Sequence, residues 1–190
     1  MEGYAPDDRE LMREMRRVRR TQKGKRLLWG LFIWTFLSAA VGIFLMYQFF
    51  TLATVHGPGM GETAPSGSVL LVRPVREGQP PARGDVVLIA REESWEIKRV
   101  AAVGGDAVDQ DENGCLTING TAIAGYNAPW SAELPEQPFT VPEGEYFVLG
   151  DRYGLSVDSR SPVFGTVRRE NVVGTAKYIL WPAYRIGEIR

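Results

Sequence analysis

The sequence of residues 27–50 is LLWGLFIWTFLSAAVGIFLMYQFF, an apolar stretch near the start of a 190-residue chain. Its clearly polar side chains are those of Thr35, Ser38 and Gln48. As an α-helix this stretch extends about 36 Å, enough to cross a hydrocarbon core of about 30 Å with some tilt. A cleaved secretory signal has a shorter apolar region, of about 7–15 residues, and a core helix of this length shows a polar face. The stretch therefore predicts an uncleaved transmembrane anchor.

Charge predicts the orientation of this anchor. Residues 1–26 contain nine of the 22 basic residues and five of the 23 acidic ones, and the first Lys or Arg after the anchor is Arg73. By the positive-inside rule, we expect a cytoplasmic tail at 1–26, a single-pass anchor at 27–52 in the plasma membrane, and an extracytoplasmic domain at 53–190. The outer part keeps 13 basic and 18 acidic residues, which argues against nucleic-acid binding. The basic tail suits anionic lipids of the bilayer.

The outer part has the pattern of a β domain, with short β-branched runs separated by Gly and Pro. Strands are expected at 69–72, 85–90, 95–100, 115–118 and 146–149, followed by a late strand pair at 170–174 and 176–181. No helical periodicity of useful length follows the anchor. The fold class is therefore mainly β, a small antiparallel barrel or sheet domain behind a single N-terminal transmembrane helix.

The rare residues limit the chemistry. Cys115 is the single cysteine, so an intrachain disulfide is excluded and a cysteine-based metal site is not credible. His56 is the single histidine, and no Gly-x-Ser-x-Gly motif accompanies it, which argues against a Ser-His-Asp triad. We expect neither a metal nor a cofactor.

Lys98 is the most informative charged residue of the outer part. A lysine in water is a poor base, with a pKa of about 10.4, and burial without a counter-charge can lower the pKa of a lysine by several units. The strand at 95–100 can point Lys98 and the residues two positions away inward, while Ile97 and Arg99 face the other side. Without further context, a lysine on a strand is usually a surface residue.

Four motifs give that context. They are Gly57-Pro58-Gly59-Met60, Arg83-Gly84-Asp85, Lys98-Arg99-Val100, and Gly150-Asp151 followed by Ser156-Val157-Asp158-Ser159-Arg160. Their order and spacing after one anchor resemble bacterial type I signal peptidases, the serine/lysine proteases that remove signal peptides from exported preproteins. The resemblance covers roughly residues 27–190.

The resemblance implies a role for each matched residue. Lys98 is then the general base, and Ser156 hydrogen-bonds the lysine amine and orients it. Structural roles fall to Asp151 and to an ion pair between Asp158 and Arg160. The substrate-binding positions are Gly57, Met60 and Ile97. Partners would be exported preproteins or pilin-like subunits that carry signal peptides.

The nucleophile position departs from the family pattern. The family has a serine immediately before the methionine of the first motif, and here that residue is Gly59. Glycine has no side chain and cannot form an acyl-enzyme, although its backbone N–H can still act as an oxyanion-hole donor. The hydroxyls of Thr63, Ser66 and Ser68 lie too far along the chain to replace it without a local rearrangement. A negative charge at Glu62 can also pair with Lys98.

Three hypotheses follow from this pattern, and whether the chain is an enzyme stays open among them. The first is a signal-peptidase-like protein that has lost proteolysis and keeps a groove for extended peptides, acting as a binding or assembly factor. The second is an active type I signal peptidase that cleaves by an atypical or restored Ser/Lys mechanism. The third is a membrane-anchored β domain whose resemblance is one of fold alone.

Overall fold

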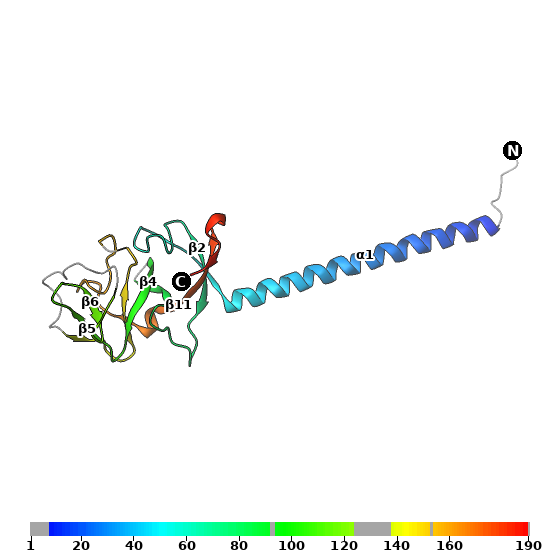
Figure 1. Ribbon diagram of the computed structural model, residues 1–190. Coiled ribbons are helices and arrows are strands. Elements are labelled where there is room, and N and C mark those ends of the chain that lie inside the picture. Colours follow the sequence, from blue (N-terminus) through cyan, green and yellow to red (C-terminus); the bar gives the residue numbers. More distant parts are fainter. Residues whose placement is uncertain (1–7, 92–93, 124–137, 153, 190) are drawn as a thin grey trace. The chain divides into compact units, whose positions relative to one another are not determined.

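The computed structural model describes residues 8–91, 94–123, 138–152 and 154–189. The chain divides into two compact units, Met1–Gln48 and Phe49–Arg190 (Figure 1). The first unit contains one helix and the second contains the strands, as the sequence predicts for a mainly β fold behind one apolar helix.

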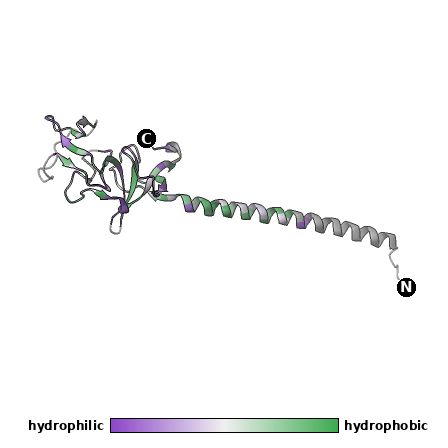
Figure 2. Ribbon diagram, turned by 90° about the horizontal axis from the view of Figure 1, so that it is seen from below, coloured by the Kyte–Doolittle hydropathy of each residue, from purple (hydrophilic) through white to green (hydrophobic). Residues whose placement is uncertain are grey.

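The helix α1 runs from Asp8 to Phe49 without a break. Its segment Leu28–Met46 is strongly apolar (Figure 2), with a mean hydropathy of 2.0, and none of it is buried. A helix that is apolar all round and long enough to span a bilayer fits an anchor better than a surface helix. The polar side chains within it bond to the helix backbone, since Thr35 Oγ1 donates to the Phe32 carbonyl and Ser38 Oγ to the Thr35 carbonyl, each at 2.9 Å.

The larger sheet of the second unit is antiparallel. Its order is β1-β2-β11-β3-β4-β9-β10, with β12 paired to β11. The strands are β1 (Thr51–Thr54), β2 (Val69–Pro74), β3 (Val86–Arg91), β4 (Ser94–Val103), β9 (Glu145–Leu149), β10 (Val167–Arg168), β11 (Val172–Trp181) and β12 (Gly187–Glu188). Short 3-10 helices occupy Arg169–Asn171 and Ala183–Arg185. Strand β1 begins two residues after α1 ends, so the last residues of the expected anchor, 51 and 52, belong to the sheet.

The smaller sheet has the order β7-β6-β5-β8 and forms a separate end of the unit (Figure 1). Its strands are β5 (Ala107–Gln110), β6 (Leu116–Ile118), β7 (Thr121–Ala122) and β8 (Phe139–Thr140). Its buried residues Val108, Leu116 and Ile118 pack with Phe147 and Leu149 of β9. The core is therefore continuous from one sheet to the other.

The prediction of a strand pair at the end of the chain is wrong. Residues 172–181 form the single strand β11, with register shifts against β2 that mark a bulge or irregularity. Gly174 does not mark a turn between two strands there. A Cβ on Gly174 would lie 2.6 Å from Val72 Cγ1, so the absence of a side chain serves the close approach of β2.

The Arg83-Gly84-Asp85 motif connects separate parts of this unit. Arg83 forms an ion pair with Asp106, at the start of the smaller sheet, and Asp85 accepts a hydrogen bond from Lys177 of β11 at 3.0 Å. Gly84 has a φ of 88°, a conformation that favours glycine. These contacts fix the loop before β3, which pairs with the strand that carries Lys98.

Candidate active site

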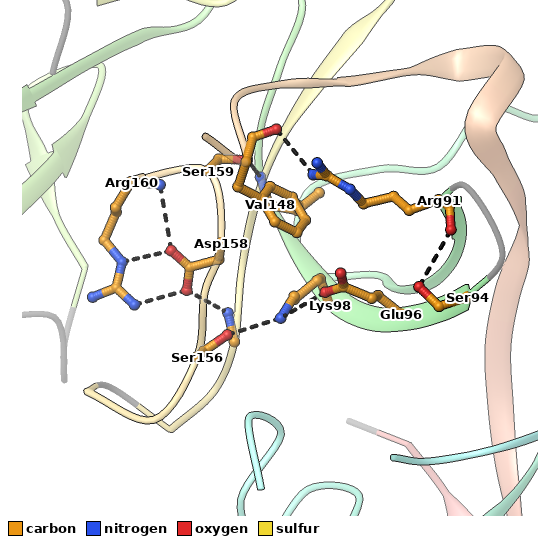
Figure 3. A network of polar contacts seen from close by, with 11 residues as sticks. Arg91, Ser94, Glu96, Lys98, Val148, Ser156, Asp158, Ser159 and Arg160 are labelled. Atoms are coloured by element: carbon orange, nitrogen blue, oxygen red, sulfur yellow. Dashed lines mark hydrogen bonds and ion pairs between the residues drawn. The ribbon is translucent and has the colours of Figure 1, made fainter. Parts of the chain in front are cut away.

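Lys98 is buried in the middle of β4, with 7% of its surface exposed. Its Nζ donates a hydrogen bond to Ser156 Oγ at 3.0 Å and lies 3.2 Å from Glu96 Oε2 (Figure 3). The Phe164 ring centroid is 5.5 Å from Nζ. The lysine amine is therefore buried, with a hydroxyl, a carboxylate and an aromatic ring around it.

The pleat of β4 explains two of these neighbours. Residues two apart on a strand share a face, so Glu96 and Lys98 point the same way. Val100 lies on that face too, and packs in the same cluster as Phe164, while Ile97 packs in a second cluster on the other face. Because both faces of β4 are covered at this point, Lys98 is buried although it is charged.

The loop after β9 carries Ser156 to the lysine. Gly150 N–H donates to Asp158 Oδ2 at 3.0 Å. Asp158 forms an ion pair with Arg160 at 2.7 Å (Figure 3). Asp158 is 1% exposed, so this charge pair sits inside the loop rather than on a solvated turn. At the start of the loop, Asp151 pairs with Arg99 of β4 at 2.6 Å. The loop is thus attached directly to the strand that carries Lys98.

Gly59 lies beside Lys98 and Ser156, although the sequence separates all three widely. A Cβ on Gly59 would be 3.3 Å from Ser156 Oγ and 3.8 Å from Lys98 Nζ. The Gly59 carbonyl accepts a hydrogen bond from Arg152 N–H at 2.9 Å, which joins the two loops. Gly57 and Gly61 have φ values of 81° and 53°, whereas Gly59 lies outside the positive-φ region. The backbone at position 59 can therefore take a side chain without the strain of that region.

Gly150 completes the close packing of these loops. A Cβ on Gly150 would overlap the Ser156 side chain and lie 2.7 Å from the Gly59 carbonyl oxygen. Position 150 must therefore stay free of a side chain for Ser156 to occupy its place.

The three expected substrate-binding residues lie in different environments. Gly57 is exposed in the loop before Gly59. Met60 is 1% exposed and Ile97 8% exposed, and both pack in one hydrophobic cluster, so their side chains support the site from behind. An open groove of about 660 Å³ lies nearby, lined by Thr51, Leu52, Ala53, Thr54, His56, Ser94 and Trp95.

The carboxylate next to the lysine is that of Glu96. The sequence allowed Glu62 as a partner of Lys98, but the ion pair is formed by Glu96. Glu62 is exposed, and its backbone carbonyl accepts a hydrogen bond from Arg185 Nη1 at 2.8 Å. The position of Glu96, two residues before Lys98 on one strand, was the signal that could have identified it.

The chemistry available to this arrangement is limited by position 59. A lysine held against a serine hydroxyl is an arrangement that serine/lysine peptidases use. At the position beside this pair, Gly59 supplies a backbone N–H and no hydroxyl. Among the described residues, no group of three or more His, Cys, Asp or Glu side chains comes together to hold a metal ion.

The known proteins that this chain resembles in sequence are signal peptidases. The family model described as signal peptidase, peptidase S26, matches residues 27–181. Signal peptidase I of Bacillus amyloliquefaciens is 30% identical over 170 residues, covering 81% of this chain and 84% of that protein. Signal peptidase I T of Bacillus subtilis is 30% identical over 169 residues, covering 82% and 86%. A solved signal peptidase I from Enterococcus faecalis is 31% identical, covers 50% of this chain and 95% of its own, and has a TM-score of 0.40. The chain belongs to the signal peptidase family, peptidase S26.

Proposed function

We propose that this protein binds exported preproteins at the outer face of the plasma membrane and has lost the proteolytic step that a serine at position 59 would perform. The observation that carries the proposal is Gly59 itself. It lies next to Lys98 and Ser156 and has no side-chain nucleophile. A site that keeps its scaffold and lacks its nucleophile can still recognise a substrate.

The groove beside the site supports binding of an extended peptide. Strand β1 stands at the edge of the larger sheet and pairs with β2 on one side. Its residues line the groove together with the start of β4. Leu52 and Trp95 are exposed there, at 59% and 51%. An extended segment can add to such an edge through main-chain hydrogen bonds and place apolar side chains against these residues.

The membrane placement belongs to the same proposal. Segment Leu28–Met46 anchors the chain, and the basic tail before it stays in the cytoplasm. The β unit then faces the side on which exported preproteins or pilin-like subunits emerge. Binding without cleavage suits a factor that holds such subunits during export or assembly.

The test is a paired measurement on the full-length protein in detergent micelles. A preprotein with an Ala-x-Ala cleavage site is added, and both binding and cleavage are followed. We expect saturable binding without turnover. Trp95→Ala should weaken binding, because it removes an exposed aromatic from the groove, while Tyr184→Ala, which changes an aromatic that is 83% exposed elsewhere, should not. Absence of binding would refute the proposal.

A second candidate function, slow cleavage through Ser156, is favoured by its 3.0 Å hydrogen bond to Lys98. Ser156 Oγ would attack the scissile carbonyl carbon and pass its proton to the neutral amine of Lys98. That proton would then go to the leaving amine as the C–N bond breaks, and water would hydrolyse the ester. Against this candidate, the Glu96 carboxylate lies 3.2 Å from Lys98 Nζ and competes with Ser156 for the amine. Cleavage that disappears in Ser156→Ala would favour this second candidate.

A further inference from the structure

An open hollow lies where the chain leaves β2 and where it enters β11, and it contains none of the residues of the candidate active site. Its volume is about 670 Å³, a size typical of ligand sites, and it is lined by Val75, Arg76, Glu77, Gly78, Arg169, Glu170 and Val172. Val75 N–H donates to the Val173 carbonyl at 3.1 Å, and Arg169 N–H donates to the Gly144 carbonyl at 2.9 Å. Both lining segments are therefore fixed to neighbouring parts of the fold.

The hollow has an apolar floor and a charged rim. Val172 is 4% exposed and belongs to a core cluster, against which Val75 also packs. The charged side chains around it are exposed, and they are those of Arg76, Glu77, Arg169 and Glu170. Such a surface suits a small ligand that carries charges at its outer end and apolar groups below them.

Three of the four charges on the rim are available to a ligand. Glu170 Oε1 lies 3.7 Å from Arg168 Nη1, so this carboxylate already has a partner. Within the described part of the chain, Arg76, Arg169 and Glu77 form no ion pair. Guanidinium groups match the geometry of phosphate oxygens, and a carboxylate accepts hydrogen bonds from an ammonium group. The rim therefore fits a ligand with one phosphate and one ammonium group.

The hollow also lies close to the point where the chain leaves the apolar segment. Arg76 Cζ is 4.8 Å from the centroid of the Phe49 ring. Phe49 is the last residue of α1 and follows the apolar segment, which ends at Met46, by three residues. At 1.5 Å per residue Phe49 is about 4.5 Å beyond that end, and the headgroup layer of a bilayer is about 5–7 Å thick on each side. With Leu28–Met46 as the anchor, Arg76 lies at the depth of the lipid headgroups.

We propose that this hollow binds the headgroup of an aminophospholipid, a lipid with a phosphodiester and a primary ammonium group. The phosphate oxygens accept hydrogen bonds from Arg76 and Arg169, and the ammonium group donates to Glu77. The glycerol end of the lipid lies toward Phe49, from which the acyl chains enter the bilayer. This inference rests on the membrane anchor and does not depend on peptide binding.

The experiment compares two lipids that differ in one group. Phosphatidylethanolamine and phosphatidylcholine with identical acyl chains are added in equal amounts to the full-length protein in detergent micelles, and native mass spectrometry counts the bound molecules of each. The choline group carries the same charge, but its methyl groups leave it without an N–H donor. Hydrogen bonds to charged groups at an exposed rim predict roughly 3- to 10-fold more bound phosphatidylethanolamine.

Variants of the rim assign that preference to the hollow. Glu77→Gln should remove the preference between the two lipids, because the ammonium group loses its acceptor. Arg76→Gln combined with Arg169→Gln should lower the binding of both lipids, because both have the phosphate. The matched control is Arg73→Gln, which removes an exposed arginine of β2 that does not line the hollow and should keep the preference. Circular dichroism checks the fold of each variant.

Four results would overturn the inference. They are equal binding of the two lipids, a preference that survives Glu77→Gln, loss of the preference in Arg73→Gln, and tighter binding of phosphatidylglycerol than of phosphatidylethanolamine. The last result would show that net negative charge is recognised rather than the paired groups. Soluble glycerophosphoethanolamine, which has no acyl chains, should compete weakly. If it competes as well as the lipid, the ligand is a soluble phosphate compound and the lipid assignment is wrong.

Discussion

Replacing Gly59 with serine should restore part of a signal-peptidase reaction. The backbone at position 59 is outside the positive-φ region, so a side chain is allowed there. The new Cβ would lie 3.8 Å from Lys98 Nζ, and a hydroxyl on it in the rotamer that faces Nζ falls within hydrogen-bond reach. The introduced hydroxyl would then be the nucleophile, with Lys98 as its base.

The structure also limits the expected rate. The new Cβ would be 3.3 Å from Ser156 Oγ, so one of the two must move by a few tenths of an ångström. At about 100-fold per ångström of misplacement, such a shift costs roughly 3- to 5-fold in rate. Glu96 Oε2 lies 3.2 Å from Lys98 Nζ, so this carboxylate competes with the introduced hydroxyl for the amine. We therefore expect weak cleavage from Gly59→Ser and faster cleavage from Gly59→Ser with Glu96→Gln.

The assay is release of the mature protein from an Ala-x-Ala preprotein by purified full-length variants. Gly59→Ala is the matched control, because it adds the same Cβ without a hydroxyl and should not cleave. Glu62→Gln, combined with Gly59→Ser, removes a carboxylate other than the one paired with Lys98 and should not increase the rate. Lys98→Met in the Gly59→Ser background should lower the rate by about 100-fold or more, the usual contribution of a general base.

The reasoning is refuted if Gly59→Ser, folded and able to bind the preprotein, shows no cleavage even with Glu96→Gln. It is equally refuted if Gly59→Ala cleaves as fast as Gly59→Ser, since the hydroxyl would then have no role.

Three further predictions concern topology and stability. A reporter that is active solely in the cytoplasm, fused to the C-terminus, should be inactive; activity would reverse the proposed orientation. Burial favours a higher pKa for Asp106, but hydrogen bonds from Val103 N–H, Arg83 and Asn119 outweigh it and lower the pKa below 3.8. Its stabilisation is therefore full above about pH 4 and lost as the pH falls through the lower folded-state pKa, and urea unfolding of Asp106→Asn should show a weaker dependence on pH in that range. Gly174→Ala should lower the free energy of unfolding by about 1–3 kcal/mol because its Cβ would meet β2, whereas Gly187→Ala, with its nearest neighbour at 3.9 Å, should change it by less than about 0.5 kcal/mol; equal effects would contradict the close approach.

The general architecture could be predicted from the sequence because it depends on local patterns. An apolar stretch of membrane length needs no tertiary information, and short β-branched runs located β2, β3, β4, β6 and β9 to within a few residues. The prediction of a strand pair at the end of the chain was wrong because the first expected strand ended at Gly174. Its actual role, the close approach of β2, depends on a contact far away in sequence.

The candidate site could be predicted from the sequence in part. Residues Lys98 and Ser156 are 58 positions apart, and their proximity followed from the resemblance rather than from any local pattern. The partner of the lysine was missed because an ion pair depends on side-chain direction. Strand alternation places Glu96 on the same face as Lys98. The distance between its carboxylate and the Lys98 amine, however, depends on side-chain rotamers that no sequence pattern specifies.

Cleavage of an Ala-x-Ala preprotein by the purified wild-type protein, measured alongside binding, tests the central claim most directly. We predict that the preprotein binds and stays intact. Turnover of the bound preprotein that disappears in Lys98→Ala would contradict the claim, because it would show that the protein cleaves with Gly59 in place.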